Sequence, residues 1–84
     1  MKNVNETIQT FRISKSYVGY ESKNRPNYET GLTMEQAVII LDATESGWIR
    51  NGGTIIERTE DSLTVEESDG SQVIIFSIIE EYYN

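Results

Sequence analysis

The chain has 84 residues and a formal net charge of −7, and it contains neither cysteine nor histidine. These absences exclude disulfides, the common zinc sites and the nucleophile pairs that use histidine as a base, so we expect no metal site. Small secreted domains usually carry disulfides, so we expect a cytoplasmic protein, and the negative charge disfavours direct binding to nucleic acid or membranes.

The N-terminal part of the chain predicts a strand followed by a loop. From Phe11 onward, Phe11, Ile13 and Tyr17 alternate with polar residues, which is the period-two pattern of a half-buried strand. Residues 21–31 contain the only proline, Pro26, together with asparagines and Gly31. Because this composition is typical of turns, residues 19–31 are predicted to form a long loop.

The clearest signal in the chain is a helix that begins after Thr33. Thr33 is a good N-cap, and Gln36 stands three residues later, which is the spacing of a capping box. The apolar residues then recur near helical spacing and are expected in the core: Met34, Ala37, Val38, Leu41 and Trp48. Gly47 marks the predicted end of the helix, ahead of the break at Asn51-Gly52-Gly53.

The C-terminal part predicts three antiparallel strands at 54–59, 63–67 and 72–79, with turns at Glu60-Asp61 and Asp69-Gly70. If both turns are tight, Val65 faces Ile74 and Ile56 faces Val65. One face of the sheet then gathers Ile56, Leu63, Val65, Ile74, Phe76 and Ile78, and the helix covers it. Residues 1–84 are therefore expected to form a single small α+β domain with an N-terminal β-strand, one α-helix and a three-stranded antiparallel β-meander (β-α-β-β-β).

The opposite face of the predicted sheet is also apolar, at Val73, Ile75 and Ile79. A sheet with one helix normally leaves one face in water, so something should cover these side chains. Two interpretations stay open: the N-terminal strand folds across them, or another chain binds there.

Charge is divided unevenly along the sequence. Residues 1–28 carry a net charge of +3 and residues 29–84 carry −10. Carboxylates two residues apart on a strand face are separated by roughly 6.5–7 Å, close to the spacing of successive phosphates along a nucleic-acid strand. An array of carboxylates could therefore occupy a groove that lysine and arginine line in a partner. The array would consist of Glu57, Glu60, Asp61, Glu66, Glu67 and Asp69. The plainer interpretation is that these charges keep a small protein in solution.

Catalysis is not expected from the paired carboxylates, which include Glu80-Glu81. They lie in predicted turns or near the end of the chain, where water would keep their pKa values ordinary, whereas an acid-base pair needs one raised pKa in a cleft. We therefore predict no catalytic residue and no cofactor.

Two tyrosines of the predicted loop, Tyr20 and Tyr28, flank Lys23 and Arg25. Aromatic and cationic side chains are enriched in interface hot spots, so Tyr20 and Tyr28 are candidate anchors for a partner. The alternative is that this segment pairs with the acidic half of its own chain.

In its small size, its acidity, its lack of Cys and His and its bare α+β layout, the chain is similar to small inhibitors encoded by phages and mobile elements, such as anti-CRISPR and anti-restriction proteins. The similarity extends over the whole chain but carries no diagnostic motif and no site residue. It implies a non-enzymatic inhibitor or modulator, in the host cytoplasm if phage-encoded, that mimics nucleic acid and binds a basic nucleic-acid-handling protein. The alternative is an assembly or scaffold protein that forms a homodimer through Val73, Ile75 and Ile79.

Overall fold

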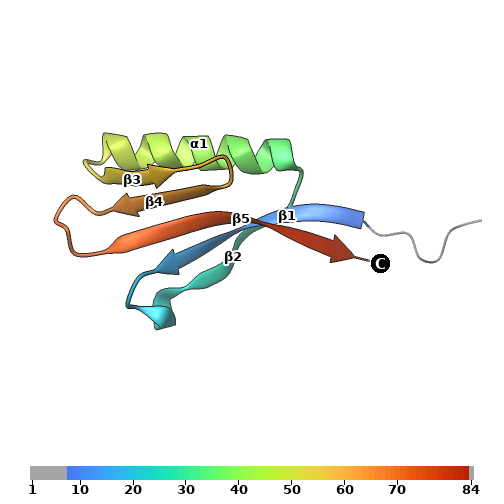
Figure 1. Ribbon diagram of the computed structural model, residues 1–84, viewed down its shortest axis with the longest axis horizontal. Helices are drawn as coiled ribbons and strands as arrows, with labels where there is room; N and C mark the ends of the chain where they lie inside the picture. Colours follow the sequence, from blue (N-terminus) through green and yellow to red (C-terminus); the bar gives the residue numbers. More distant parts are fainter. Residues whose placement is uncertain (1–7, 84) are drawn as a thin grey trace, which may run out of the picture.

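Five strands and one α-helix make up the described part of the chain, which is an α+β fold (Figure 1). The structure is a computed structural model that describes residues 8–83, with side chains through Tyr82. In chain order the elements are β1 (Ile8–Tyr17), the short 3-10 helix η1 (Glu21–Lys23), β2 (Arg25–Leu32), α1 (Met34–Arg50), β3 (Thr54–Arg58), β4 (Ser62–Glu66) and β5 (Val73–Tyr83). The expected order β-α-β-β-β is wrong by one strand, because β2 precedes the helix.

The strands form one antiparallel sheet in the order β2-β1-β5-β4-β3. The predicted meander is therefore part of a larger sheet, in which β1 lies between β2 and β5. The helix α1 connects the two edge strands, β2 and β3, and lies across one face of the sheet (Figure 1).

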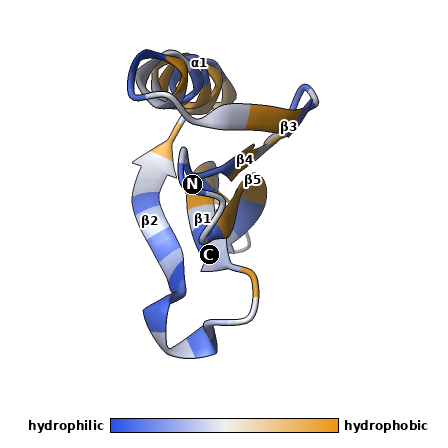
Figure 2. Ribbon diagram, turned by 90° about the vertical axis from the view of Figure 1, so that its left-hand side faces the viewer, coloured by the Kyte–Doolittle hydropathy of each residue, from blue (hydrophilic) through white to orange (hydrophobic). Residues whose placement is uncertain are grey.

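The segment 19–31, predicted to be a long loop, instead contains η1 and the edge strand β2. Phe11 pairs with Leu32 and Lys15 pairs with Arg25, and the register shifts twice between these pairs. An edge strand tolerates proline and bulges because only one side of its backbone is paired. Loop-like composition is thus compatible with β2, and Figure 2 shows the strand as mostly hydrophilic.

The helix α1 begins as predicted. The backbone N–H of Gln36 donates to Thr33 Oγ1 at 3.0 Å, and the backbone N–H of Thr33 donates to Gln36 Oε1 at 2.9 Å, which confirms the capping box. The predicted end at Gly47 is wrong, because the helix continues to Arg50 and ends at Asn51. Packing of the residues around Gly47 outweighs its weak helix propensity.

The predicted pairing of Val65 with Ile74 is confirmed, and in the same register Leu63 faces Phe76. The pairing of β3 with β4 corrects one residue, because Ile55, and not Ile56, faces Val65. The register shifts between Ile55 and Glu57, so Ile56 is the extra residue of a β-bulge and its side chain is 54% exposed.

The core lies between α1 and the sheet. In Figure 2, apolar colouring is prominent on β3 and β5. Its fully buried members are Ile13, Ala37, Leu41, Leu63, Val65, Ile74 and Phe76. Burying these side chains away from water supplies the main favourable term in folding. Of the six residues predicted for this face, only Ile56 lies outside the core and its packed neighbours.

The other face of the sheet, opposite α1, has no covering element among residues 8–83. Ile75 lies opposite Thr64 and Ser16, and Ile79 lies opposite Arg12. The N-terminal strand therefore does not fold across this face, because β1 lies in the sheet beside β5. We name this surface the outer face; the side chains of Val73, Ile75 and Ile79, which lie on it, are half-buried.

Candidate partner-binding surface

The bulged strand β3 and strand β4 place two carboxylates on the outer face. Glu57 lies opposite Thr64, and Glu66 lies opposite Thr54, so the two glutamates belong to the same side of the sheet and are diagonal neighbours across the strand pair. Diagonal positions of an antiparallel pair are about 7–8 Å apart. This general value is slightly larger than the roughly 6.5–7 Å expected for carboxylates two residues apart on one strand.

The other four predicted carboxylates lie in the two turns. Glu60 and Asp61 form the β3–β4 turn, which the backbone N–H of Thr59 closes on the carbonyl of Ser62 at 2.9 Å. Glu67 and Asp69 belong to the β4–β5 turn at the other end of β4. Five residues of β4 separate the two turns, about 17 Å of extended chain. The six residues form a band along the β3–β4 side of the sheet, and we name Glu57, Glu60, Asp61, Glu66, Glu67 and Asp69 the acidic band.

Local hydrogen bonds hold two carboxylates of the band in place. Ser71 donates its hydroxyl to Glu67 Oε2 and its backbone N–H to Asp69 Oδ1, both at 2.9 Å. The hydroxyl and backbone N–H of Ser71 lower the pKa of Asp69 below its ordinary value, because donors stabilise the charged form. Asp69 therefore stays ionised at neutral pH.

The only cation in β3, β4, β5 and their turns is Arg58. Arg58 lies opposite Leu63, on the side of the sheet that faces α1. Its guanidinium contacts two helix carboxylates, with Nη2 2.6 Å from Asp42 Oδ1 and Nε 3.5 Å from Glu45 Oε1. The charge of Arg58 is therefore directed to the helix, and it does not neutralise the acidic band.

The candidate anchors Tyr20 and Tyr28 lie elsewhere in the molecule. Tyr20 is 46% exposed between β1 and η1, with Lys23 Nζ 5.2 Å from its ring centroid. Tyr28 is 37% exposed in β2, the edge of the sheet opposite β3. Four strand spacings, about 19 Å, separate these two edges. The structure does not bring the tyrosines together with the acidic band.

An aromatic cluster that the sequence analysis missed surrounds Lys15. Its Nζ lies 5.2 Å from the ring centroid of Tyr17, 5.4 Å from that of Tyr28 and 5.6 Å from that of Phe76. Tyr28 and Phe76 meet edge to face at 5.7 Å. The alternation of Lys15 with the serines of β1 could have indicated that it shares a face with Ile13 and Tyr17. The cluster joins β2 to the core and holds the ring of Tyr28.

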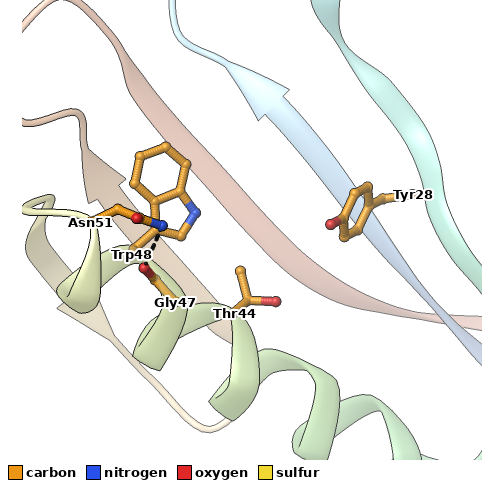
Figure 3. Close-up of a pocket in the computed structure, with 5 residues that line it drawn as sticks. All are labelled: Tyr28, Thr44, Gly47, Trp48 and Asn51. Carbon is orange, nitrogen blue, oxygen red and sulfur yellow. Dashed lines mark hydrogen bonds between the residues drawn. The ribbon is translucent and has the colours of Figure 1, made fainter.

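A cleft of about 260 Å³ lies between the C-terminal half of α1 and β2. Its lining residues are Tyr28, Thr44, Gly47, Trp48 and Asn51, and Figure 3 shows Trp48 and Tyr28 on opposite sides of it. Trp48 was expected in the core; its half-buried side chain packs against the core and also lines this cleft. Among residues 8–83, the side chains that line the cleft carry no charge.

Among residues 8–83, no group of three or more His, Cys, Asp or Glu side chains is placed to hold a metal ion. Within the same range, no helix is both long enough and apolar enough to cross a bilayer. Comparisons of the chain with protein-family models, with curated protein sequences and with solved structures find no match.

Proposed function

We propose that this chain is a non-enzymatic inhibitor or modulator that binds a basic, nucleic-acid-handling protein through the acidic band. The observation that carries the proposal is the separation of charge on the sheet. The β3–β4 side bears the six carboxylates of the band, and its one cation, Arg58, is engaged by Asp42 and Glu45 on the helix side.

The spacing of the band supports mimicry of nucleic acid. Glu57 and Glu66 are diagonal neighbours, and the two acidic turns extend the row of charges at either end of β4. A groove that normally binds phosphates would meet carboxylates at similar intervals, so the chain would exclude the nucleic acid sterically and electrostatically. Because opposite charges steer the two proteins together, association is expected to be fast at low salt and slower at high salt. A nucleic-acid mimic of the anti-CRISPR or anti-restriction type would act in this way.

The band, and not the two tyrosines, forms the proposed contact, because Tyr20 and Tyr28 lie across the sheet from it. They remain candidates for a second contact on the β1–β2 side, where Lys15, Lys23 and Arg25 make the local charge positive.

A pull-down from host lysate at low salt tests the proposal, with elution by a salt gradient and identification by mass spectrometry. We expect a nuclease, polymerase or other nucleic-acid-binding protein that elutes at moderate salt. The partner should elute from the double variant Glu57→Gln and Glu66→Gln at a lower salt concentration than from the wild type. From Glu29→Gln, a control variant with an exposed change on β2, it should elute at the same salt concentration as from the wild type. A partner whose affinity does not change with salt, or which both variants retain equally, would contradict the proposal.

A second candidate function is self-association as an assembly or scaffold protein. The observation that favours it is the outer face, where Val73, Ile75 and Ile79 are apolar and no element of residues 8–83 covers them. Two copies would bury these side chains across a two-fold axis. Analytical ultracentrifugation of the wild type and of Ile75→Glu discriminates between the two functions. If the wild type is a dimer and the variant is a folded monomer, the assembly function is supported. If the wild type is already a monomer, only the inhibitor proposal stands.

A further inference from the structure

Strand β5 is longer than the strand that pairs with it on one side. β4 pairs with residues 73–77 of β5, whereas β1 pairs with β5 as far as Tyr83. In Figure 1 the ends of β1 and β5 extend beyond β3 and β4 as a two-stranded ribbon. The last backbone hydrogen bond on the β4 side runs from the N–H of Ile78 to the carbonyl of Asp61, at 2.8 Å.

The direction of that bond shows which backbone groups of β5 lie on its open side. Amides of alternate residues point to the same side of a strand. Because the N–H of Ile78 points toward the β4 side, the N–H groups of Glu80 and Tyr82 point there too, where no strand of residues 8–83 lies. Unpaired N–H and C=O groups in a row are a template for pairing with another strand.

Side chains hold this open edge in an extended conformation. Tyr82 donates its hydroxyl to Glu80 Oε2 at 2.6 Å, and Gln9 Nε2 on β1 donates to the Tyr82 oxygen at 3.2 Å. On the outer face, Arg12 Nε lies 3.4 Å from Glu81 Oε2. The edge is therefore braced on both faces before any partner arrives, which lowers the entropy lost on binding.

The charges along the edge decide what can pair with it. Glu80 and Glu81 lie on it, and the turn residues Glu60 and Asp61 adjoin its beginning at Ile78. A second copy paired antiparallel through the same residues would place glutamates against glutamates, and like charges directly opposite each other are destabilising. An extended segment with positive charges would instead form cross-strand ion pairs.

We propose that the edge of β5 from Ile79 to Tyr82, beyond the bond between Ile78 and Asp61, binds an extended basic segment of the partner protein as an additional antiparallel strand, in line with β4. This inference rests on the proposed function, because it names the part of the basic partner that binds. Main-chain hydrogen bonds to Glu80 and Tyr82 supply affinity, and the glutamates supply selectivity. The segment carries two consecutive basic residues opposite Glu81 and Glu80, followed by an apolar residue opposite Ile79.

A capped synthetic peptide of sequence Thr-Lys-Arg-Val is the probe, and its binding is measured by NMR on the full chain. At saturation, hydrogen exchange at the amides of Glu80 and Tyr82 should slow by about tenfold or more, because both become donors to the new strand. The same peptide with an N-methylated arginine keeps its charge but lacks the amide, and it should not slow these amides.

Two substitutions at one position separate the backbone contribution from the charge. Glu80→Pro removes an outward N–H that no described residue uses, and proline is tolerated on such an edge. We expect this variant to bind the peptide at least about tenfold more weakly than Glu80→Gln, which lacks the charge but keeps the N–H. Unchanged chemical shifts for Phe11 and Ile13 verify that the β1–β5 ribbon is intact.

Three results would overturn the inference. Peptide binding without slowed exchange at Glu80 and Tyr82 would show that the edge is not the site. Equal affinities for Glu80→Pro and Glu80→Gln would show that the outward N–H is not used, and a dimer abolished by Glu80→Pro would make a second copy the occupant. The proposed function fails separately, when no basic protein is retained or when changes in the acidic band have no effect on its retention.

Discussion

Arg58 Nη2 lies 2.6 Å from Asp42 Oδ1, so the edge strand β3 is tied to the middle of helix α1 by an ion pair. Glu45, one helical turn from Asp42, contacts the same guanidinium. The ion pair links β3 to α1 on the inner side of the sheet, and Glu57 lies on the outer side of β3.

A double-mutant cycle with Arg58→Ala and Asp42→Asn should give a coupling energy of about 0.5–1 kcal/mol in urea unfolding. The value is modest because Asp42 is largely exposed and water screens the pair. Arg58→Ala alone should cost more than Asp42→Asn, since it also removes the contact with Glu45. Additive single effects would show that this ion pair does not contribute to stability.

The bulge in β3 predicts unequal effects of truncating two adjacent isoleucines. Ile55→Ala should lower the free energy of unfolding by about 2 kcal/mol, because Ile55 packs against the core. Ile56→Ala should change it by less than about 0.5 kcal/mol, because its side chain is 54% exposed. Urea unfolding of the two variants measures both effects. The reverse order would support the tight-turn register without a bulge.

Two glycines should respond oppositely to substitution by alanine. Gly47→Ala should stabilise the chain by about 0.5–1 kcal/mol, because Gly47 lies within α1 and an added Cβ meets nothing closer than Arg50 Nη2 at 3.8 Å. Gly53→Ala should destabilise it by about 1–3 kcal/mol, because its Cβ would lie 2.9 Å from Trp48 Cε3 and 3.1 Å from the carbonyl oxygen of Glu66. Thermal unfolding followed by tryptophan fluorescence compares the two variants, and similar melting temperatures would contradict the described packing of Trp48.

Tyr82 should titrate above the ordinary tyrosine pKa. Its hydroxyl donates to the Glu80 carboxylate, which raises the pKa of Tyr82 above 10.0 because only the protonated phenol can donate. The stabilisation is therefore complete below the pKa of an unfolded tyrosine and is lost as pH rises through the folded value. NMR titration of the Tyr82 ring should show the raised pKa in the wild type and a lower one in Glu80→Gln. An equal pKa in both proteins would show that the hydrogen bond is absent in solution.

Local signals in the sequence were enough to predict the helix start and the β4–β5 register. The capping box needs only Thr33 and Gln36, and the Asp69-Gly70 turn sets the pairing of Val65 with Ile74. Both depend on residues close together in the chain, where backbone geometry follows directly from residue type.

The missed features depend on contacts between distant residues. Strand β2 forms because it pairs with the edge of β1. The local sequence around Pro26 and Gly31 does not indicate this pairing. Counting residues back from the turn does not predict the bulge at Ile56. Ile55 and Ile56 have the same strand propensity, so the sequence does not show which of them is the extra residue. The residues of the acidic band could be predicted from the sequence. Whether Arg58 neutralises them could not be predicted, because that depends on the side of the sheet on which the Arg58 side chain lies.

The first strand, β1, and the last strand, β5, pair in the middle of the sheet, and this order affects folding during synthesis. Ile8 pairs with Tyr83, so the longest pairing in the sheet links residues from opposite ends of the described chain. During synthesis the β1–β2 hairpin and α1 emerge from the ribosome well before β5, and the sheet between β1 and β4 stays open until the last strand is released. Pairings between residues so far apart in the sequence form slowly. The two halves of the sheet are therefore joined only after β5 has left the ribosome, and a truncation that removes residues 73–77 would disrupt the centre of the sheet.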